Sequence, residues 1–86
     1  MAKYTFYEDP GHGWLKVPMT ELVDLGIAGL ITSCSYRDSD HAYLEEDCDY
    51  ATFDVAMTDA GIKYTYTEKY QDPCRIRNFD RYQEET

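Results

Sequence analysis

Apolar and polar side chains alternate along several short stretches of the chain, as they do in β-strands that bury one face. The clearest alternation covers residues 62–70, where Ile62, Tyr64 and Tyr66 fall on one face and mainly lysine and threonine on the other. It predicts a strand that ends before Pro73. The same pattern predicts further strands over residues 4–7, 14–17, 30–37 and 43–46.

Turn-forming residues predict how two of these stretches are connected. Residues 38–41 join the strands on either side of them as a hairpin turn. Residues 75–82 leave two alternatives open. They form an edge strand that runs through Ile76, or they pack Phe79 and Tyr82 against the sheet.

A first short helix is predicted over residues 18–25. Pro18 suits a first helical turn, because a backbone N–H there would have no partner within the helix. Leu22 and Leu25 supply the buried edge, and Gly26 ends the helix.

A second helix is predicted over residues 50–60, where Phe53 and Met57 recur at helical spacing. Asp47 or Asp49 precedes it. Either side chain can accept hydrogen bonds from the free N–H groups of the first turn.

These elements predict a single small α+β domain over residues 1–86. A chain of 86 residues has room for one core. We expect an antiparallel or mixed sheet of about four to five strands, with two short helices on one face. The other face is expected to stay open and to present Tyr7, Tyr36 or Tyr43 as a docking surface.

The net charge of the chain limits the class of molecule that it can bind. The net charge is −9, and all of this excess lies in residues 1–60. Direct nucleic-acid binding needs a basic footprint that this acidic body lacks, so we expect a basic protein partner. The arginines near the C-terminus alternate with apolar residues as in an RNA-contacting segment, but we expect them instead to offset the acidic body by pairing with its carboxylates; they are Arg75, Arg77 and Arg81.

The densest carboxylates lie between Asp38 and Asp49. Spaced carboxylates can imitate the phosphate track of a nucleic acid and occupy the basic groove of a nuclease or a polymerase-like protein. The alternative is a solvated hairpin edge followed by a helix cap. A calcium site is disfavoured because the stretch lacks the ligand order of an EF-hand loop. The mimicry hypothesis predicts partner contacts at Asp38, Asp40, Tyr43, Glu45, Glu46 and Asp47.

Few features of the sequence indicate a catalytic residue. His12 and His41 lie in a glycine-rich loop and a turn, where lone histidines are usually surface residues. The chain has no CxxC, no phosphate-binding glycine loop, no GxSxG and no HExxH motif. We expect no catalytic residue, no cofactor and no metal, and therefore a protein that is not an enzyme. The alternative is a small enzyme or binder that acts on a nucleotide signal through His12 and carboxylates.

The three cysteines have no close pairing, which predicts reduced thiols acting as small buried hydrophobic groups. The chain starts without the apolar region of a signal peptide. No apolar run approaches the roughly 20 residues that span a bilayer. We therefore expect a cytoplasmic protein with no membrane segment.

Four stretches, residues 12–18, 25–27, 42–49 and 75–79, resemble a family of short uncharacterised proteins carried by bacteriophages and plasmids. The resemblance implies only the biological context in which the protein acts. Compact acidic proteins of mobile elements are often inhibitors of host defence, including anti-CRISPR proteins and antirestriction DNA mimics. The expected partner is then a nucleic-acid-binding defence effector in the bacterial host cytoplasm. A further alternative is a homodimeric regulatory protein whose open sheet face pairs with itself.

Overall fold

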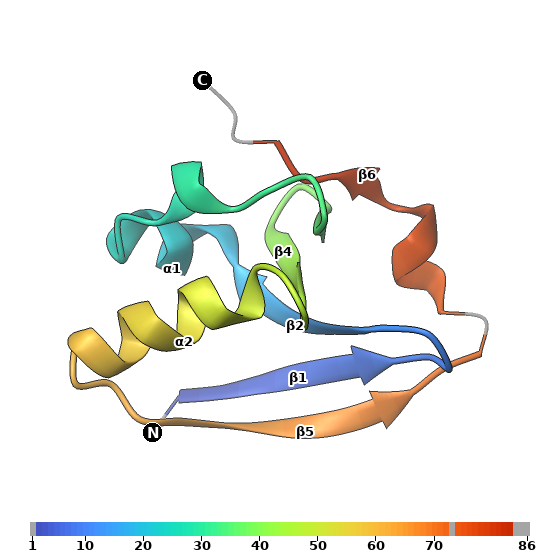
Figure 1. Cartoon of the computed structure of the whole chain (residues 1–86), viewed down its shortest axis with the longest axis horizontal. Helices are drawn as coiled ribbons and strands as arrows, with labels where there is room; N and C mark the ends of the chain where they lie inside the picture. The colour runs from blue at the N-terminus through green and yellow to red at the C-terminus, as the bar shows by residue number, and fades with distance from the viewer. Residues whose placement is uncertain (1, 73, 84–86) are drawn as a thin grey trace.

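The structure, a computed structural model, describes residues 2–72 and 74–83. Two helices lie on the same side of the sheet (Figure 1), which confirms the α+β class. The elements in chain order are β1 (Ala2–Glu8), β2 (Gly13–Pro18), α1 (Met19–Asp24), the 3₁₀ helix η1 (Ala28–Leu30), β3 (Tyr36–Arg37), β4 (His41–Glu45), α2 (Tyr50–Asp59), β5 (Tyr64–Tyr70), the 3₁₀ helix η2 (Arg75–Asn78) and β6 (Asp80–Arg81).

Across the described residues the sheet is mixed, with six strands in the order β5-β1-β2-β4-β3-β6. β1 and β5 run parallel, and every other neighbouring pair is antiparallel. The sheet has one strand more than the expected range because the two-residue strand β6 pairs with β3, placing Tyr36 opposite Arg81. Both predicted helices form, and Gly26 and Gly61 follow them with positive φ angles of 74° and 70°.

The strand predicted over residues 30–37 is wrong, because only Tyr36 and Arg37 pair with β4. The residues before them form a turn that Ser35 N closes onto Thr32 O at 3.2 Å. Asp49 fixes this turn from outside the segment. Its carboxylate accepts hydrogen bonds from Thr32 N at 3.1 Å, from Thr32 Oγ1 at 2.9 Å and from Ser35 Oγ. Side-chain bonds of this kind give the backbone an alternative to a strand ladder.

The expected capping role of Asp49 is also corrected. Asp49 occupies the position before α2, but its side chain makes no capping hydrogen bond there. It is 1% exposed and its carboxylate is directed to the turn at residues 32–35. The hydroxyl of Ser35 donates to Asp49 and accepts from Glu45 N at 3.0 Å. A buried chain of hydrogen bonds therefore links the start of α2 to the end of β4.

Both faces of the sheet bury side chains, so the expectation of an open aromatic face is wrong. The helix-covered face holds a core that includes Leu15, Leu44 and Phe53. The opposite face holds a second core, which η2 and the residues around it cover through Ile76 and Cys74. The second core also contains Tyr7, Trp14, Tyr36 and Tyr43.

The C-terminal segment combines the two alternatives that the sequence left open. Ile76 lies in η2 rather than in a strand, and it is buried. Phe79 packs against Tyr43 with ring centroids 5.0 Å apart. Tyr82 is buried in the helix-side core and donates its hydroxyl hydrogen to Ala28 O at 2.6 Å. The edge strand is β6, which follows η2. None of the described helices is long and apolar enough to cross a membrane.

Replacing Asp49 with asparagine tests the buried network. Asp49→Asn keeps the side-chain shape but replaces an acceptor with a donor, which opposes the donors of Thr32 and Ser35. We expect the free energy of unfolding to fall by about 2–4 kcal/mol, measured by urea denaturation. Asp59→Asn makes the same chemical change at the exposed end of α2 and should alter stability by less than about 0.5 kcal/mol. Equal stability of the two variants would contradict the role assigned to Asp49.

Candidate functional site

The acidic run predicted as the partner-binding surface divides into two groups. Asp38 and Asp40 lie in the turn before β4, and Glu45, Glu46 and Asp47 lie at its far end. The five residues of β4 separate these groups by about 13 Å, since a strand rises roughly 3.3 Å per residue. The run is therefore not one continuous track of charge.

The group at the turn is mainly structural. Asp38 accepts hydrogen bonds from Asp40 N at 2.9 Å, His41 N at 2.8 Å and the Tyr43 hydroxyl at 2.7 Å. Burial acts to raise the pKa of Asp38, but these hydrogen bonds outweigh it and lower the pKa. Burial and the Asp38 carboxylate raise the pKa of Tyr43, whose residue is 3% exposed. Tyr43 thus offers a partner no surface, and Asp40 is the exposed carboxylate of this group.

The second group concentrates negative charge. Glu46 and Asp47 are exposed, whereas Glu45 is 8% exposed and accepts hydrogen bonds from His12 Nδ1 at 3.2 Å and from Asp47 N. The pKa of Glu46 is raised, first by desolvation and then by the charges of Asp47, Glu45 and Glu8. We call the carboxylates of Glu8, Glu45, Glu46 and Asp47 the acidic end of the sheet.

Gly13 allows the chain to pass close beneath the acidic end. Its carbonyl accepts a hydrogen bond from Glu46 N at 2.9 Å. A Cβ atom on Gly13 would lie 2.5 Å from two ring atoms of Phe6 and 3.2 Å from Glu46 Oε2. Glycine is needed here because backbone and ring approach closely, and not because of a positive φ angle.

His12 is positioned by a loop that Asp9 organises. Asp9 Oδ1 accepts hydrogen bonds from Gly11 N and His12 N, both at 2.9 Å. The same carboxylate accepts two hydrogen bonds from the Arg77 guanidinium, one of them from Nη2 at 3.1 Å. The bond from Arg77 is the largest cause of a lowered Asp9 pKa. This pair confirms for Arg77 the predicted pairing of the C-terminal arginines with the acidic body.

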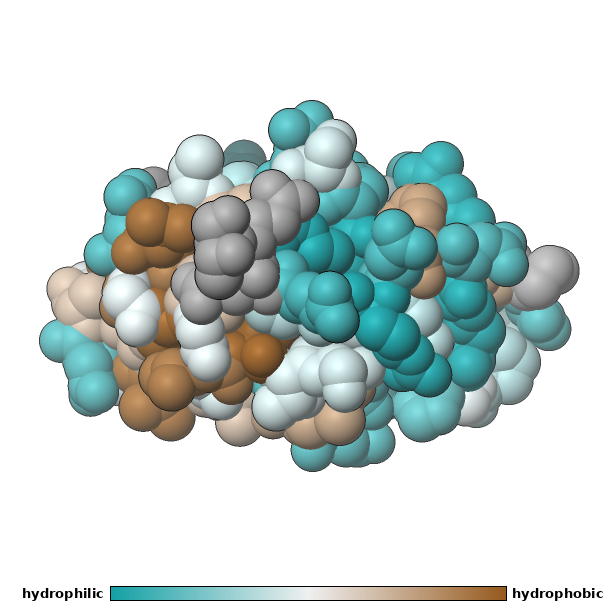
Figure 2. Space-filling view, turned by 90° about the horizontal axis from the view of Figure 1, so that it is seen from above, coloured by the Kyte–Doolittle hydropathy of each residue, from teal (hydrophilic) through white to brown (hydrophobic). Residues whose placement is uncertain are grey.

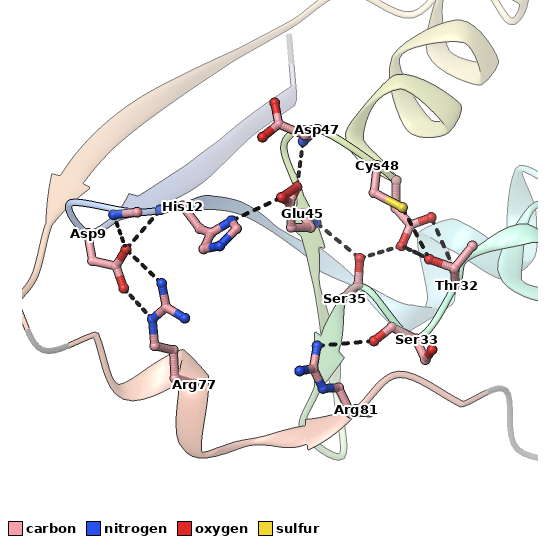
Figure 3. Close-up of polar contacts among 12 residues, drawn as sticks. Asp9, His12, Thr32, Ser33, Ser35, Glu45, Asp47, Cys48, Arg77 and Arg81 are labelled. Carbon is pink, nitrogen blue, oxygen red and sulfur yellow. Dashed lines mark hydrogen bonds and ion pairs between the residues drawn. The ribbon is translucent and has the colours of Figure 1, made fainter.

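A small hollow of about 90 Å³ opens beside His12, and Figure 3 shows the polar side chains around it. Arg77 lies over the Trp14 ring, 5.2 Å from its centroid, and Arg81 lies over the Tyr36 ring at 4.6 Å. We call this space the His12 hollow. It is lined by His12, Trp14, Cys34, Tyr36, Glu45, Arg77 and Arg81.

The sequence signalled His12 and the carboxylates but not their assembly with two arginines. Residues 12 and 77 are far apart in the chain, and only the packing of η2 on the second core brings them together. No spacing motif could have indicated the His12 hollow, because its residues come from β2, β3, β4, η2, β6 and the loops between them.

Three neighbouring side chains carry donor atoms of the kind that bind metal ions. One ligand atom each from His12, Glu45 and Asp47 lies within 4.8 Å of the others. However, Glu45 already accepts hydrogen bonds from His12 Nδ1 and Asp47 N. Arg77 and Arg81 line the adjoining hollow, and their charges oppose a cation there. The arrangement therefore suits an oriented imidazole better than a metal centre.

The remaining candidate residues lie outside the His12 hollow, apart from Cys34. His41 Nδ1 is 3.9 Å from Asp38 Oδ1 in the hairpin turn. The expectation of buried cysteines holds for Cys74 but is wrong for Cys34, which is exposed, and Cys48 is intermediate. A hydrogen bond with Cys34 is the largest cause of a raised Cys48 pKa. No spacing between cysteines indicated this contact beforehand.

An apolar groove runs between the helices on another part of the surface. Figure 2 shows hydrophobic side chains gathered on one side of the face seen from above. Leu25, Leu30 and Val55 are among the residues that line the groove, and the carboxylates of Asp24 and Asp59 lie beside them. Leu30 and Val55 are both more than half exposed.

The pH dependence of stability tests the link between Asp9 and Arg77. At neutral pH, Asp9→Asn should lower the free energy of unfolding only modestly, because the Arg77 side chain is 43% exposed and solvent screens the pair. The folded pKa of Asp9 is depressed, so this contribution is present above the ordinary carboxyl pKa of ~3.9 and is lost as pH falls below it. Urea unfolding of both proteins at several pH values measures the difference. A difference that stayed constant down to acid pH would contradict the assignment.

The proposed function rests on the geometry of these side chains. No protein-family model, no curated protein and no solved structure matches this chain.

Proposed function

We propose that this protein is a stoichiometric, non-catalytic inhibitor that binds a basic, nucleic-acid-binding surface of a partner protein. The resemblance of the sequence to short proteins of bacteriophages and plasmids supplies the biological context. The partner is then a host defence effector such as a CRISPR nuclease, and the site of action is the cytoplasm of a bacterial host cell. The acidic end of the sheet makes the central contact.

The observation that carries this proposal is the concentration of carboxylates at the acidic end. Desolvation is the largest cause of the raised Glu46 pKa and the neighbouring carboxylates add to it, so part of the cost of ionising this group is electrostatic repulsion. A surface of arginine and lysine would relieve the repulsion and accept the exposed carboxylates of Glu46 and Asp47 as it accepts phosphate. The net charge of −9 adds long-range attraction, which accelerates association at low salt.

An exposed aromatic side chain lies next to the acidic end. β5 pairs with β1 so that Tyr70 is opposite Glu8, and Tyr70 is 62% exposed. Tyrosine is favoured as an anchor in interfaces because it buries a large ring and keeps a polar tip. Tyr70 therefore takes the role of neighbouring aromatic contact that the sequence assigned to Tyr43. Glu45 supports this surface through its hydrogen bond from Asp47 N. Tyr43 and Asp40 lie outside it, because Tyr43 is hydrogen-bonded to Asp38 and Asp40 is at the far end of β4.

Charge reversal at the acidic end tests the proposal. Glu46→Lys with Asp47→Lys should leave the fold intact, since both side chains are exposed, and should abolish inhibition of the partner. The measurement begins with affinity capture of the tagged protein from a lysate with active defence systems, at low and high salt, followed by mass spectrometry. Each recovered nucleic-acid-binding protein is then purified, and its nucleic-acid binding is measured with wild type and variant.

A matched variant separates the local contact from total charge. Asp59→Lys with Asp80→Lys produces the same change in net charge at exposed positions away from the acidic end. This control should slow association modestly and retain inhibition. If both double variants inhibit as well as wild type, or if both fail equally, the acidic end is not the contact surface.

A further inference from the structure

We propose that the His12 hollow binds an oxyanion of phosphate size, carried as the terminal phosphate of a small ligand or free as inorganic phosphate. This inference is independent of the inhibitor function, because its ligand is a small anion and its donors, His12, Arg77 and Arg81, lie outside the acidic end, which shares only Glu45 with the hollow. Three nitrogen-rich side chains, His12, Arg77 and Arg81, line the hollow together. They converge on one space from three different parts of the chain (Figure 3).

Arg81 is the principal donor for an anion in this space. Within the described residues its guanidinium makes one hydrogen bond, from Nη1 to Ser33 O at 3.3 Å, and has no carboxylate within ion-pair distance. Nε and Nη2 thus remain to donate to a ligand. The Tyr36 ring beneath holds the planar group in place. A guanidinium held flat with two donors on one edge matches the oxygens of a phosphate or carboxylate.

Arg77 supplies a second guanidinium at the opposite wall. Its Nε and Nη2 atoms are bound to Asp9, which leaves Nη1 as the donor for a ligand. Asp9 neutralises part of the charge of Arg77, so Arg77 orients a bound anion more than it attracts one. The Trp14 ring supports it as Tyr36 supports Arg81. Both arginines are therefore positioned before any ligand arrives, which lowers the entropy cost of binding.

His12 completes the set with the second nitrogen of its imidazole ring. Glu45 Oε1 lies 3.2 Å from Nδ1 and holds that nitrogen as the donor, so Nε2 is the ring atom left for a ligand. A neutral imidazole then accepts the hydrogen of a phosphate O–H, and a protonated one donates to a phosphate oxygen. Glu45 keeps its negative charge although it accepts hydrogen bonds from His12 and Asp47, so the two guanidinium groups of the hollow must outweigh its repulsion of an anion.

The size of the hollow limits the ligand. Its volume of about 90 Å³ is well below the roughly 300–1,000 Å³ of typical ligand pockets, which suits one phosphate group and not a whole nucleotide. The rest of a larger ligand would remain outside, above the exposed His12 and Cys34.

Trp14 provides the reporter, because it is the single tryptophan of the chain and lines the hollow. We would titrate the full chain with inorganic phosphate and follow the indole N–H signal in proton–nitrogen NMR. A saturable shift is expected, with a Kd on the order of 0.1–1 mM. A ribonucleoside 5′-monophosphate should produce the same shift, and the matching nucleoside should produce none. Tighter binding of the monophosphate than of free phosphate would identify a phosphorylated small molecule as the ligand.

Two variants test the assignment. Arg81→Gln should weaken phosphate binding about tenfold to a hundredfold, the range expected for losing charge-assisted hydrogen bonds. Arg75→Gln removes the same charge at an exposed position of η2 that does not line the hollow, and it should change the Kd less than about threefold. Cys34→Asp leaves every cationic group in place but adds a carboxylate at the hollow, so it should also weaken binding.

The outcomes that would overturn the inference are distinct. The absence of a saturable shift with folded wild type would exclude an oxyanion site. Equal weakening by Arg81→Gln and Arg75→Gln would reduce the effect to general charge. A saturable response to zinc chloride without any response to phosphate would assign the site to a cation held by His12, Glu45 and Asp47 instead. None of these results depends on whether the acidic end binds a partner protein.

Discussion

The buried carboxylate of Asp49 is the interaction on which the arrangement of this small domain depends. It accepts hydrogen bonds from the backbone and hydroxyl of Thr32 and from the hydroxyl of Ser35. A carboxylate that is 1% exposed is tolerated only when donors surround it in this way. The turn at residues 32–35 is thereby fixed, and with it Cys34 and the carbonyl of Ser33 that Arg81 binds. One wall of the His12 hollow is thus a consequence of this network.

The same network reaches the other wall through β4. Ser35 accepts a hydrogen bond from Glu45 N, and the Glu45 side chain continues to His12 and to Asp47. Glu45 therefore stands between the two candidate surfaces. On one side it orients the imidazole of the hollow, and on the other it adds to the negative charge that raises the pKa of Glu46. A single buried side chain couples the proposed oxyanion site to the proposed protein contact.

The second constraint is size: an 86-residue domain is only marginally stable, and this sheet buries apolar side chains on both of its faces. The helices cover one face, and the residues around η2 cover part of the other through Ile76 and Cys74. This packing explains why the arginines of an otherwise acidic chain end up beside His12. Arg77 pairs with Asp9, and Arg81 stacks on Tyr36 in the neighbouring strand. β5 stays largely exposed at the edge, which leaves Tyr70 free for contact.

The sequence by itself determined the elements whose signals are local. Alternation predicted β1, β2, β4 and β5, helical spacing predicted α1 and α2, and the glycines at 26 and 61 ended both helices. It also predicted that the C-terminal arginines would meet the acidic body, as Arg77 does. Tertiary structure decided the rest, because it depends on partners distant in the chain. Asp49 converted a predicted strand into a turn, the segment around η2 buried Tyr43, and the His12 hollow came together from residues that no local pattern connects.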